Sequence, residues 1–146
     1  MGYNQAYTAY HNASIKTASQ GRLVVMLYEA AVKNLKNAAG LFDLDGKIKT
    51  ADIEKFGGLI QKAQSIITEL QVSLDMERGG DISKNLMSLY VYFNSELMGA
   101  SIAHDRKKIE FVQNMLEELL AAWKSAANST ANAPAAVMQS ALNIEG

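Results

Sequence analysis

The chain has 146 residues, which is enough for one domain with its own hydrophobic core. Apolar residues make up 49% and charged residues 20%, a composition typical of a globular chain and not of a disordered one. There is no cysteine, which excludes disulfides and thiolate metal sites. The formal net charge of -1 gives no reason to expect nucleic acid as a partner. We find no signal-peptide pattern and no apolar run long enough for membrane insertion, and therefore expect a cytoplasmic protein.

Four segments with helical periodicity predict an all-α fold, an antiparallel four-helix bundle over residues 17–128. The first segment covers about residues 20–42. The second begins at Ile53, and its apolar positions alternate spacings of three and four as far as Leu74. Gly79–Gly80 is predicted to end this helix, with Asp81 capping a third helix over about residues 81–104. The fourth covers about residues 105–128.

The two ends of the chain are expected to lie outside the bundle. Residues 1–16 are predicted to form a short N-terminal flap, in which Tyr3, Tyr7 and Tyr10 share one side of a helical turn. Residues 129–146 form a tail of small residues, with Pro134 as the candidate start of a short helix.

The sequence does not indicate a reaction centre. Within residues 41–52, Asp43, Asp45 and Gly46 have calcium-loop spacing, but Leu41 and Asp52 occupy the positions of the first and last ligands, so a plain turn between helices is the better interpretation. The two histidines do not form the Glu-x-x-His pairs of di-metal bundles. We therefore nominate no catalytic, metal or cofactor-binding residue and do not expect an enzyme.

Several apolar residues lie beside the expected core stripes of the helices. They either widen the core or form a surface for a partner, and periodicity alone leaves both alternatives open. Surfaces rich in methionine and aromatic residues suit the apolar face of a partner helix. Together with two tyrosines of the flap, the candidate protein-binding residues are Tyr7, Tyr10, Leu59, Ile66, Met87, Tyr90, Val91, Met98, Phe111 and Met115.

Several sequence blocks resemble one known family. Thr17-Ala18-Ser19 is followed by the run Leu23–Tyr28, and later come Ser73–Glu77, Leu89–Tyr92 and Trp123. Over about residues 7–125 these blocks are similar to the flagellin-specific export chaperones of bacterial flagella. Two positions depart from the family pattern. Gln20 stands where proline is common, and Glu29-Ala30 where Asp-Gly is common.

The resemblance implies an antiparallel four-helix bundle that binds the disordered C-terminal segment of flagellin. That segment would become helical as it wraps around the chaperone. Binding would prevent premature polymerisation and assist delivery to the flagellar export apparatus. The resemblance leaves open whether the export gate and flagellar regulators also bind. Two alternatives remain: a four-helix interaction or signalling module with another helical partner, and a metal-dependent bundle enzyme.

Overall fold

The computed structural model describes residues 20–127, which fold into four long α-helices and one short 3-10 helix. The elements are α2 (Gln20–Ala39), η1 (Thr50–Asp52), α3 (Ile53–Ser73), α4 (Gly80–Ala103) and α5 (Arg106–Ala127). None of these helices has the length and apolar character needed to cross a bilayer. The predicted flap and tail lie outside the described residues.

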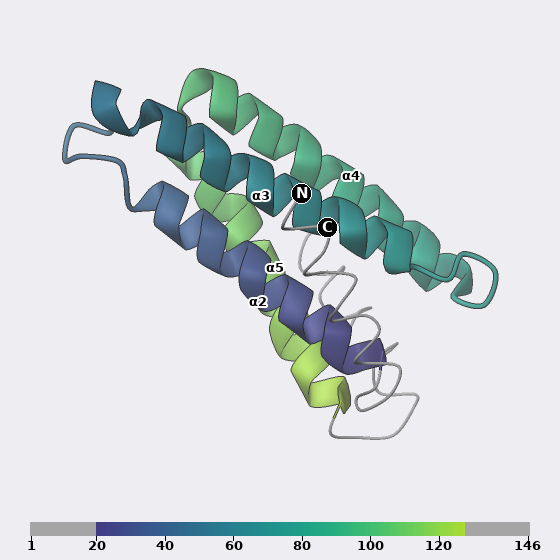
Figure 1. Cartoon of the computed structure of the whole chain (residues 1–146). Coiled ribbons are helices and arrows are strands. Elements are labelled where there is room, and N and C mark those ends of the chain that lie inside the picture. Colours follow the sequence, from purple (N-terminus) through teal and green to yellow (C-terminus); the bar gives the residue numbers. More distant parts are fainter. Residues whose placement is uncertain (1–19, 128–146) are drawn as a thin grey trace.

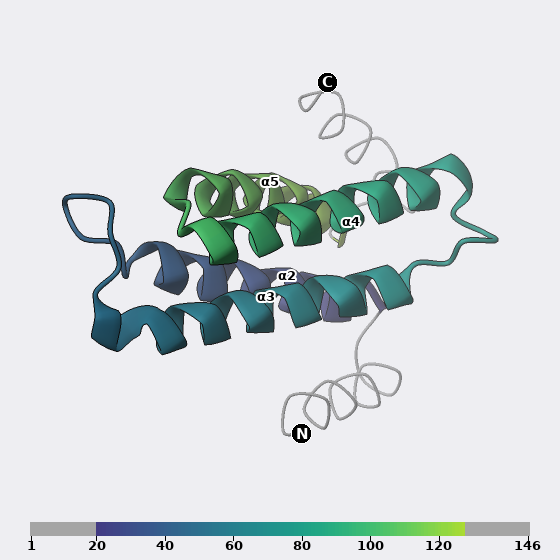
Figure 2. The same cartoon turned by 90° about the horizontal axis from the view of Figure 1, so that it is seen from above.

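The four helices form an antiparallel bundle in which neighbours in the chain are also neighbours in space (Figures 1 and 2). Helix α2 packs against α3 on one side and against α5 on the other, and α4 closes the bundle by packing on α3 and α5. Helices α2 and α4 therefore lie across a diagonal of the bundle. The predicted fold class is confirmed.

The apolar seam predicted for α3 forms the centre of the core. Ile60, Ala63, Ile67 and Leu70 are all fully buried, as the alternating spacing requires. Burying a large aliphatic side chain stabilises the fold by about 1.5–3 kcal/mol, so this seam contributes much of the stability. The prediction fails at the start of the seam, where Ile53 is exposed in the first turn.

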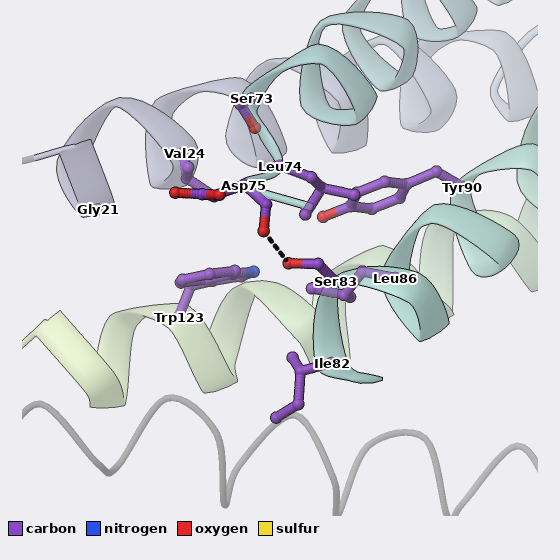
Figure 3. Close-up of a pocket in the computed structure, with 10 residues that line it drawn as sticks. All are labelled: Gly21, Val24, Ser73, Leu74, Asp75, Ile82, Ser83, Leu86, Tyr90 and Trp123. Atoms are coloured by element: carbon purple, nitrogen blue, oxygen red, sulfur yellow. Dashed lines mark hydrogen bonds between the residues drawn. The ribbon is translucent and has the colours of Figure 1, made fainter. Parts of the chain in front are cut away.

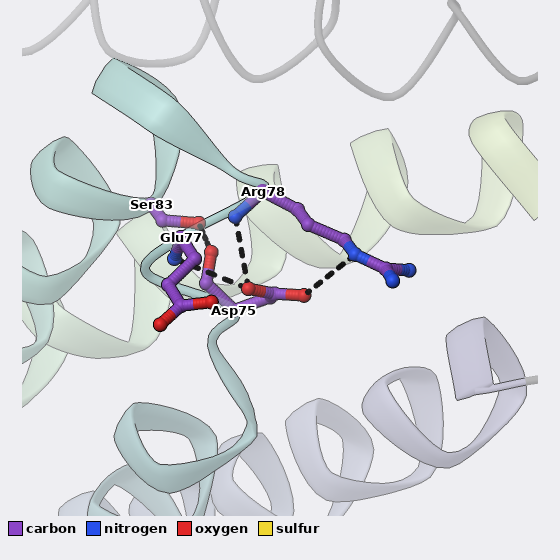
Figure 4. A network of polar contacts seen from close by, with 4 residues as sticks. All are labelled: Asp75, Glu77, Arg78 and Ser83. Carbon is purple, nitrogen blue, oxygen red and sulfur yellow. Dashed lines mark hydrogen bonds and ion pairs between the residues drawn. The ribbon is translucent and has the colours of Figure 1, made fainter.

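The connection between α3 and α4 differs from the sequence prediction. Helix α3 ends at Ser73, and the predicted stop at Gly79–Gly80 is wrong because these glycines begin α4. The Asp75 carboxylate accepts hydrogen bonds from the backbone N–H groups of Glu77 and Arg78, at 3.1 and 2.9 Å (Figure 4). These bonds give the backbone N–H groups hydrogen-bond partners outside a helix. Helix α3 therefore ends before the predicted position.

The α3–α4 connection is also hydrogen-bonded to the first turn of α4. Asp81 lies in that turn but makes no capping bond, so the prediction that it caps the helix is wrong. The Ser83 hydroxyl instead donates a hydrogen bond to the backbone carbonyl of Asp75 at 3.0 Å (Figure 4). Gly79 lies so close to both groups that a Cβ atom there would clash with them. Glycine at this position therefore allows the close approach.

The segment with partial calcium-loop spacing is the turn between helices that the sequence predicts. Asp43 Oδ1 accepts hydrogen bonds from the backbone N–H groups of Asp45 and Lys47, at 2.9 and 3.0 Å. Gly46 has a φ of 75°, in the left-handed region that glycine adopts at low cost.

The link between α4 and α5 is shorter. There His104 ends α4 in a left-handed conformation with φ of 51°.

Candidate protein-binding surface

The outer side of α4 carries a strip of exposed apolar residues. Val91 and Met98 are each 54% exposed, and Ile102 is 77% exposed. These residues are seven and four positions apart, so they share one side of the helix. We call Val91, Met98 and Ile102 the α4 strip. A row of large apolar side chains on one exposed face is typical of an interaction surface.

The adjacent edge of α3 is uncharged and is hydrogen-bonded to α4. The Gln64 side-chain amide donates to the backbone carbonyl of Asn94 at 3.2 Å. The Asn94 side-chain amide in turn donates to the Thr68 hydroxyl at 3.3 Å. Val72, one turn beyond Thr68, is 72% exposed. The outer edges of α3 and α4 therefore form one surface, with polar groups between its apolar residues.

Five of the predicted binding residues are accessible to different extents. Val91, Met98 and Phe111 are exposed, while Leu59 and Met87 are half-buried. Leu59 packs against the core. Only Val91 and Met98 of these five belong to the α4 strip.

Three predicted residues lie in the core instead. Ile66 and Tyr90 are 1% exposed and Met115 is 6% exposed, so the expectation that they lie on a surface is wrong. Each long helix packs against two neighbours, and this buries a wider arc than a single stripe of apolar residues. Tyr7 and Tyr10 lie outside the described residues, and their role stays a prediction.

Several exposed apolar residues were not predicted, among them Ile102 and Tyr92 of α4. Ile102 follows Met98 by four positions, so an extension of the Val91–Met98 spacing would have found it. Tyr92 lies on the other side of α4, where its ring contacts Phe111 of α5 edge-on with centroids 6.0 Å apart. Its hydroxyl donates a hydrogen bond to Glu96 at 2.8 Å. No spacing pattern of α4 alone indicates this contact between helices.

A pair of tyrosines joins α2 and α4 through the core. The hydroxyl groups of Tyr28 and Tyr90 are 2.6 Å apart and hydrogen-bonded. Burial raises the pKa of Tyr28 to about 12, with the Tyr90 hydroxyl and the nearby Trp123 N–H partly offsetting it. Burial likewise raises the pKa of Tyr90, and the neighbouring Tyr28 raises it further. Both phenols therefore stay neutral at physiological pH.

A small apolar cavity of about 240 Å³ lies at the end of the bundle where α3 joins α4 (Figure 3). In Figure 3 the Tyr90 hydroxyl and the Trp123 indole nitrogen point into this space. The indole N–H is buried, and no acceptor in the described part of the chain lies in hydrogen-bonding geometry to it. The residues that line the cavity come from all four helices and the α3–α4 connection. They are Gly21, Val24, Ser73, Leu74, Asp75, Ile82, Ser83, Leu86, Tyr90 and Trp123.

The charged side chains of the described residues lie mainly on the surface of the bundle. Within residues 20–127, no group of three or more His, Cys, Asp or Glu side chains is placed to hold a metal ion. The ion pairs lie on the surface, as between Arg106 and Glu110 at 3.3 Å, and such pairs contribute about 0–1 kcal/mol. This part of the chain is thus a four-helix bundle in which α3 and α4 share an uncharged, partly apolar outer surface. Helical partners bind to surfaces of this class.

Comparison with known proteins gives the family. The family model described as flagellar protein FliS matches residues 3–130, and the chain belongs to this family. The flagellar secretion chaperone FliS of Bacillus subtilis is 32% identical over 129 residues, covering 88% of this chain and 91% of the relative. The flagellar secretion chaperone FliS of Salmonella typhimurium is 34% identical over 113 residues, covering 77% of this chain and 79% of the relative. The flagellar secretion chaperone FliSB of Pseudomonas aeruginosa is 32% identical over 111 residues, covering 76% of this chain and 83% of the relative.

Proposed function

We propose that this protein is a cytosolic export chaperone for flagellin. It binds the C-terminal segment of flagellin, prevents premature polymerisation and assists delivery to the flagellar export apparatus. Membership of the FliS family and the names of the relatives, flagellar secretion chaperones, support an export role. The observation that carries the proposal is the α4 strip, because it offers apolar contact to a partner helix.

The mechanism follows from the cost of ordering a disordered client. Fixing the backbone costs about 1–2 kcal/mol per residue, so the client must bury much apolar surface to remain bound. A client helix that buries its apolar face on the chaperone cannot present that face to another flagellin molecule. Polymerisation is thereby blocked without any chemical step, and the export machinery releases the client by competing for it.

The direct test is a calorimetric titration of the full chain with a synthetic peptide of the flagellin C-terminal segment. We expect saturable binding and a gain in far-UV helicity over the sum of the separate components. An amphipathic helical peptide unrelated to flagellin is the control. Equal affinity for both peptides would favour the alternative, a general four-helix interaction module, and absence of flagellin-peptide binding would contradict the proposal.

We predict that Met98→Asp weakens binding of the flagellin peptide at least about tenfold, a loss of about 1.4 kcal/mol or more. The new charge would be desolvated against an apolar client face, whereas in the free protein Met98 is half exposed. The melting temperature should therefore change little. The matched control is Asn85→Asp, an equally charged change at an exposed site turned about 140° around α4 from Met98. Equal loss of affinity in both variants would show that charge alone, and not the strip, decides binding.

We further propose that residues 1–16 act as a displaceable flap over part of the client surface. The chain enters α2 at Gln20, directly beside the end cavity lined by Gly21 and Val24. Burying a large apolar side chain contributes about 1.5–3 kcal/mol, and ordering ten or more residues costs about 1–2 kcal/mol each. Burial of the three tyrosines of the segment would not exceed this ordering cost, so docking would be weak enough for a client to reverse.

A truncation that starts at Lys16 tests the flap. We expect the shortened protein to keep its helical circular dichroism, because the described bundle begins at Gln20. Its affinity for the flagellin peptide should rise, because the client no longer displaces the flap. Calorimetric titration of the full and shortened chains measures the difference. Identical affinities would show that the segment does not cover the client surface.

A further inference from the structure

We propose that the cavity at the end of the bundle is a binding site for a small, neutral ring compound that carries a hydrogen-bond acceptor, of which an aromatic ketone is the simplest example. The cavity lies where α3 joins α4, and the α4 strip does not contribute to its lining (Figure 3). This ligand site is therefore separate from the surface proposed for the flagellin client.

The size of the cavity limits the ligand to about one ring with a short substituent. Its volume is about 240 Å³. In other proteins a dry cavity of about 150 Å³ with apolar walls accommodates benzene. The additional space suits a substituent of about two or three non-hydrogen atoms. Apolar side chains such as Val24, Leu74 and Leu86 form much of the wall, so a ring is favoured there over water.

The polar groups at the cavity include hydrogen-bond donors that lack an acceptor. Within residues 20–127, the buried Trp123 indole N–H has no acceptor in hydrogen-bonding geometry. Tyr90 shares one hydrogen bond with Tyr28 at 2.6 Å, which uses one of their two hydroxyl hydrogens and leaves the other to be donated. An unpaired buried donor lowers stability, so a ligand that brings an acceptor gains affinity. A carbonyl oxygen has two lone pairs and can accept from both groups.

The remaining polar groups of the wall favour a neutral ligand. The Ser83 hydroxyl donates to the Asp75 backbone carbonyl at 3.0 Å, and the Ser73 hydroxyl donates to a carbonyl within α3 at 2.7 Å. Both serine hydrogens are therefore already used. Asp75 is the one charged side chain among the described lining residues, and its carboxylate would repel a carboxylic acid. A cation would lose its hydration against the apolar wall.

A bound ligand would contact all four helices, because the described lining residues come from each of them. A ligand that binds the folded protein and not the unfolded chain raises the free energy of unfolding. At ten times the dissociation constant of the ligand, the melting temperature should rise by about 3 °C or more.

The probe is acetophenone, a one-ring ketone, titrated into the full chain. Trp123 is the single tryptophan, so its indole N–H gives one resolved signal in a proton–nitrogen correlation spectrum. We expect this signal to shift downfield and to saturate as the N–H donates to the ketone, with a dissociation constant of about 1 mM or lower. Ethylbenzene has a similar shape without the acceptor and should cause no downfield shift. Benzoate, which is charged, should bind at least about tenfold more weakly than acetophenone.

Two substitutions locate the ligand. Val24→Phe fills the cavity, and Val25→Phe is the matched control at the next position of α2, which is half-buried and outside the lining. We expect the dissociation constant of acetophenone to rise at least about tenfold in the first variant and less than about twofold in the second. Trp123→Phe keeps a ring but removes the donor. The ratio of acetophenone affinity to ethylbenzene affinity, measured by ligand-detected NMR, should fall about tenfold in this variant.

Three results would overturn the ligand site. The first is the absence of saturable acetophenone binding to the full chain. Binding only to a chain shortened to start at Lys16 belongs to this case, because it would show that the protein's own N-terminal segment fills the cavity. The second is equal weakening by Val24→Phe and Val25→Phe. The third is an unchanged affinity ratio in Trp123→Phe. Each of these results leaves the proposed function standing, since flagellin binding is measured separately.

Discussion

Replacing Tyr90 by alanine is expected to lower the free energy of unfolding by about 3–5 kcal/mol. The ring is 1% exposed, so its removal leaves a cavity in the core beside the existing one. The substitution also leaves the buried Tyr28 hydroxyl without its partner at 2.6 Å. An unpaired buried hydroxyl alone costs about 1–3 kcal/mol. Tyr90→Phe isolates this second contribution, because phenylalanine keeps the ring and removes the hydroxyl.

Urea unfolding followed by circular dichroism measures both effects. Tyr92→Ala is the matched control, since Tyr92 stands two positions away on the same helix and is exposed. We expect it to change the free energy of unfolding by no more than about 1 kcal/mol. Equal destabilisation by Tyr90→Ala and Tyr92→Ala would show that the core does not depend on the buried tyrosine.

Raising the pH from about 9 to about 12 is expected to lower the free energy of unfolding by about 2–3 kcal/mol through Tyr28 alone. In the unfolded chain a tyrosine ionises near pH 10, whereas burial raises the pKa of Tyr28 in the folded protein to about 12. Below about pH 10 both states are neutral and the group adds no pH dependence. Between these two pKa values only the unfolded state ionises, so the folded state loses relative stability. Burial of Tyr90 raises its pKa too and acts in the same direction.

The measurement is the urea midpoint as a function of pH for the original protein and for the Tyr28→Phe/Tyr90→Phe double variant. The variant lacks both phenols, so its stability should fall less steeply above about pH 10. Other ionisable groups titrate equally in both proteins and cancel in the comparison. Parallel curves for the two proteins would mean that the buried tyrosines do not control alkaline unfolding.

The sequence is sufficient to predict the helices and most of the core, because aliphatic residues at spacings of three and four define a buried side. Ile60 and Leu70 are buried as that rule requires. The rule fails at the end of α3, where Leu74 continues the apolar spacing but lies beyond the helix. The Asp75 capping bonds outweigh the apolar pattern there, and such local competition is not visible in periodicity.

The candidate surface is only partly predictable for a different reason. Spacing tells which residues share a side of a helix, but the width of the buried arc depends on how many neighbours that helix contacts. Val91 was correctly placed on the surface, whereas the preceding Tyr90 lies in the core. The contact of Tyr92 with Phe111 depends on the packing of α4 on α5, which no pattern within one helix contains.

The hydrogen bond between Tyr28 and Tyr90 also bears on which bundle forms. It spans the diagonal between α2 and α4, two helices whose backbones are not in close contact. A slide of α4 by one turn, about 5.4 Å, would exchange one set of aliphatic contacts for another but would leave two hydroxyls unpaired in the core. We infer that the pair selects one axial alignment among several apolar packings of similar energy, as single buried polar residues do in coiled coils. That alignment also sets which part of α3 stands beside Val91, Met98 and Ile102. A bond in the centre of the protein thereby determines the pattern of side chains on its outside.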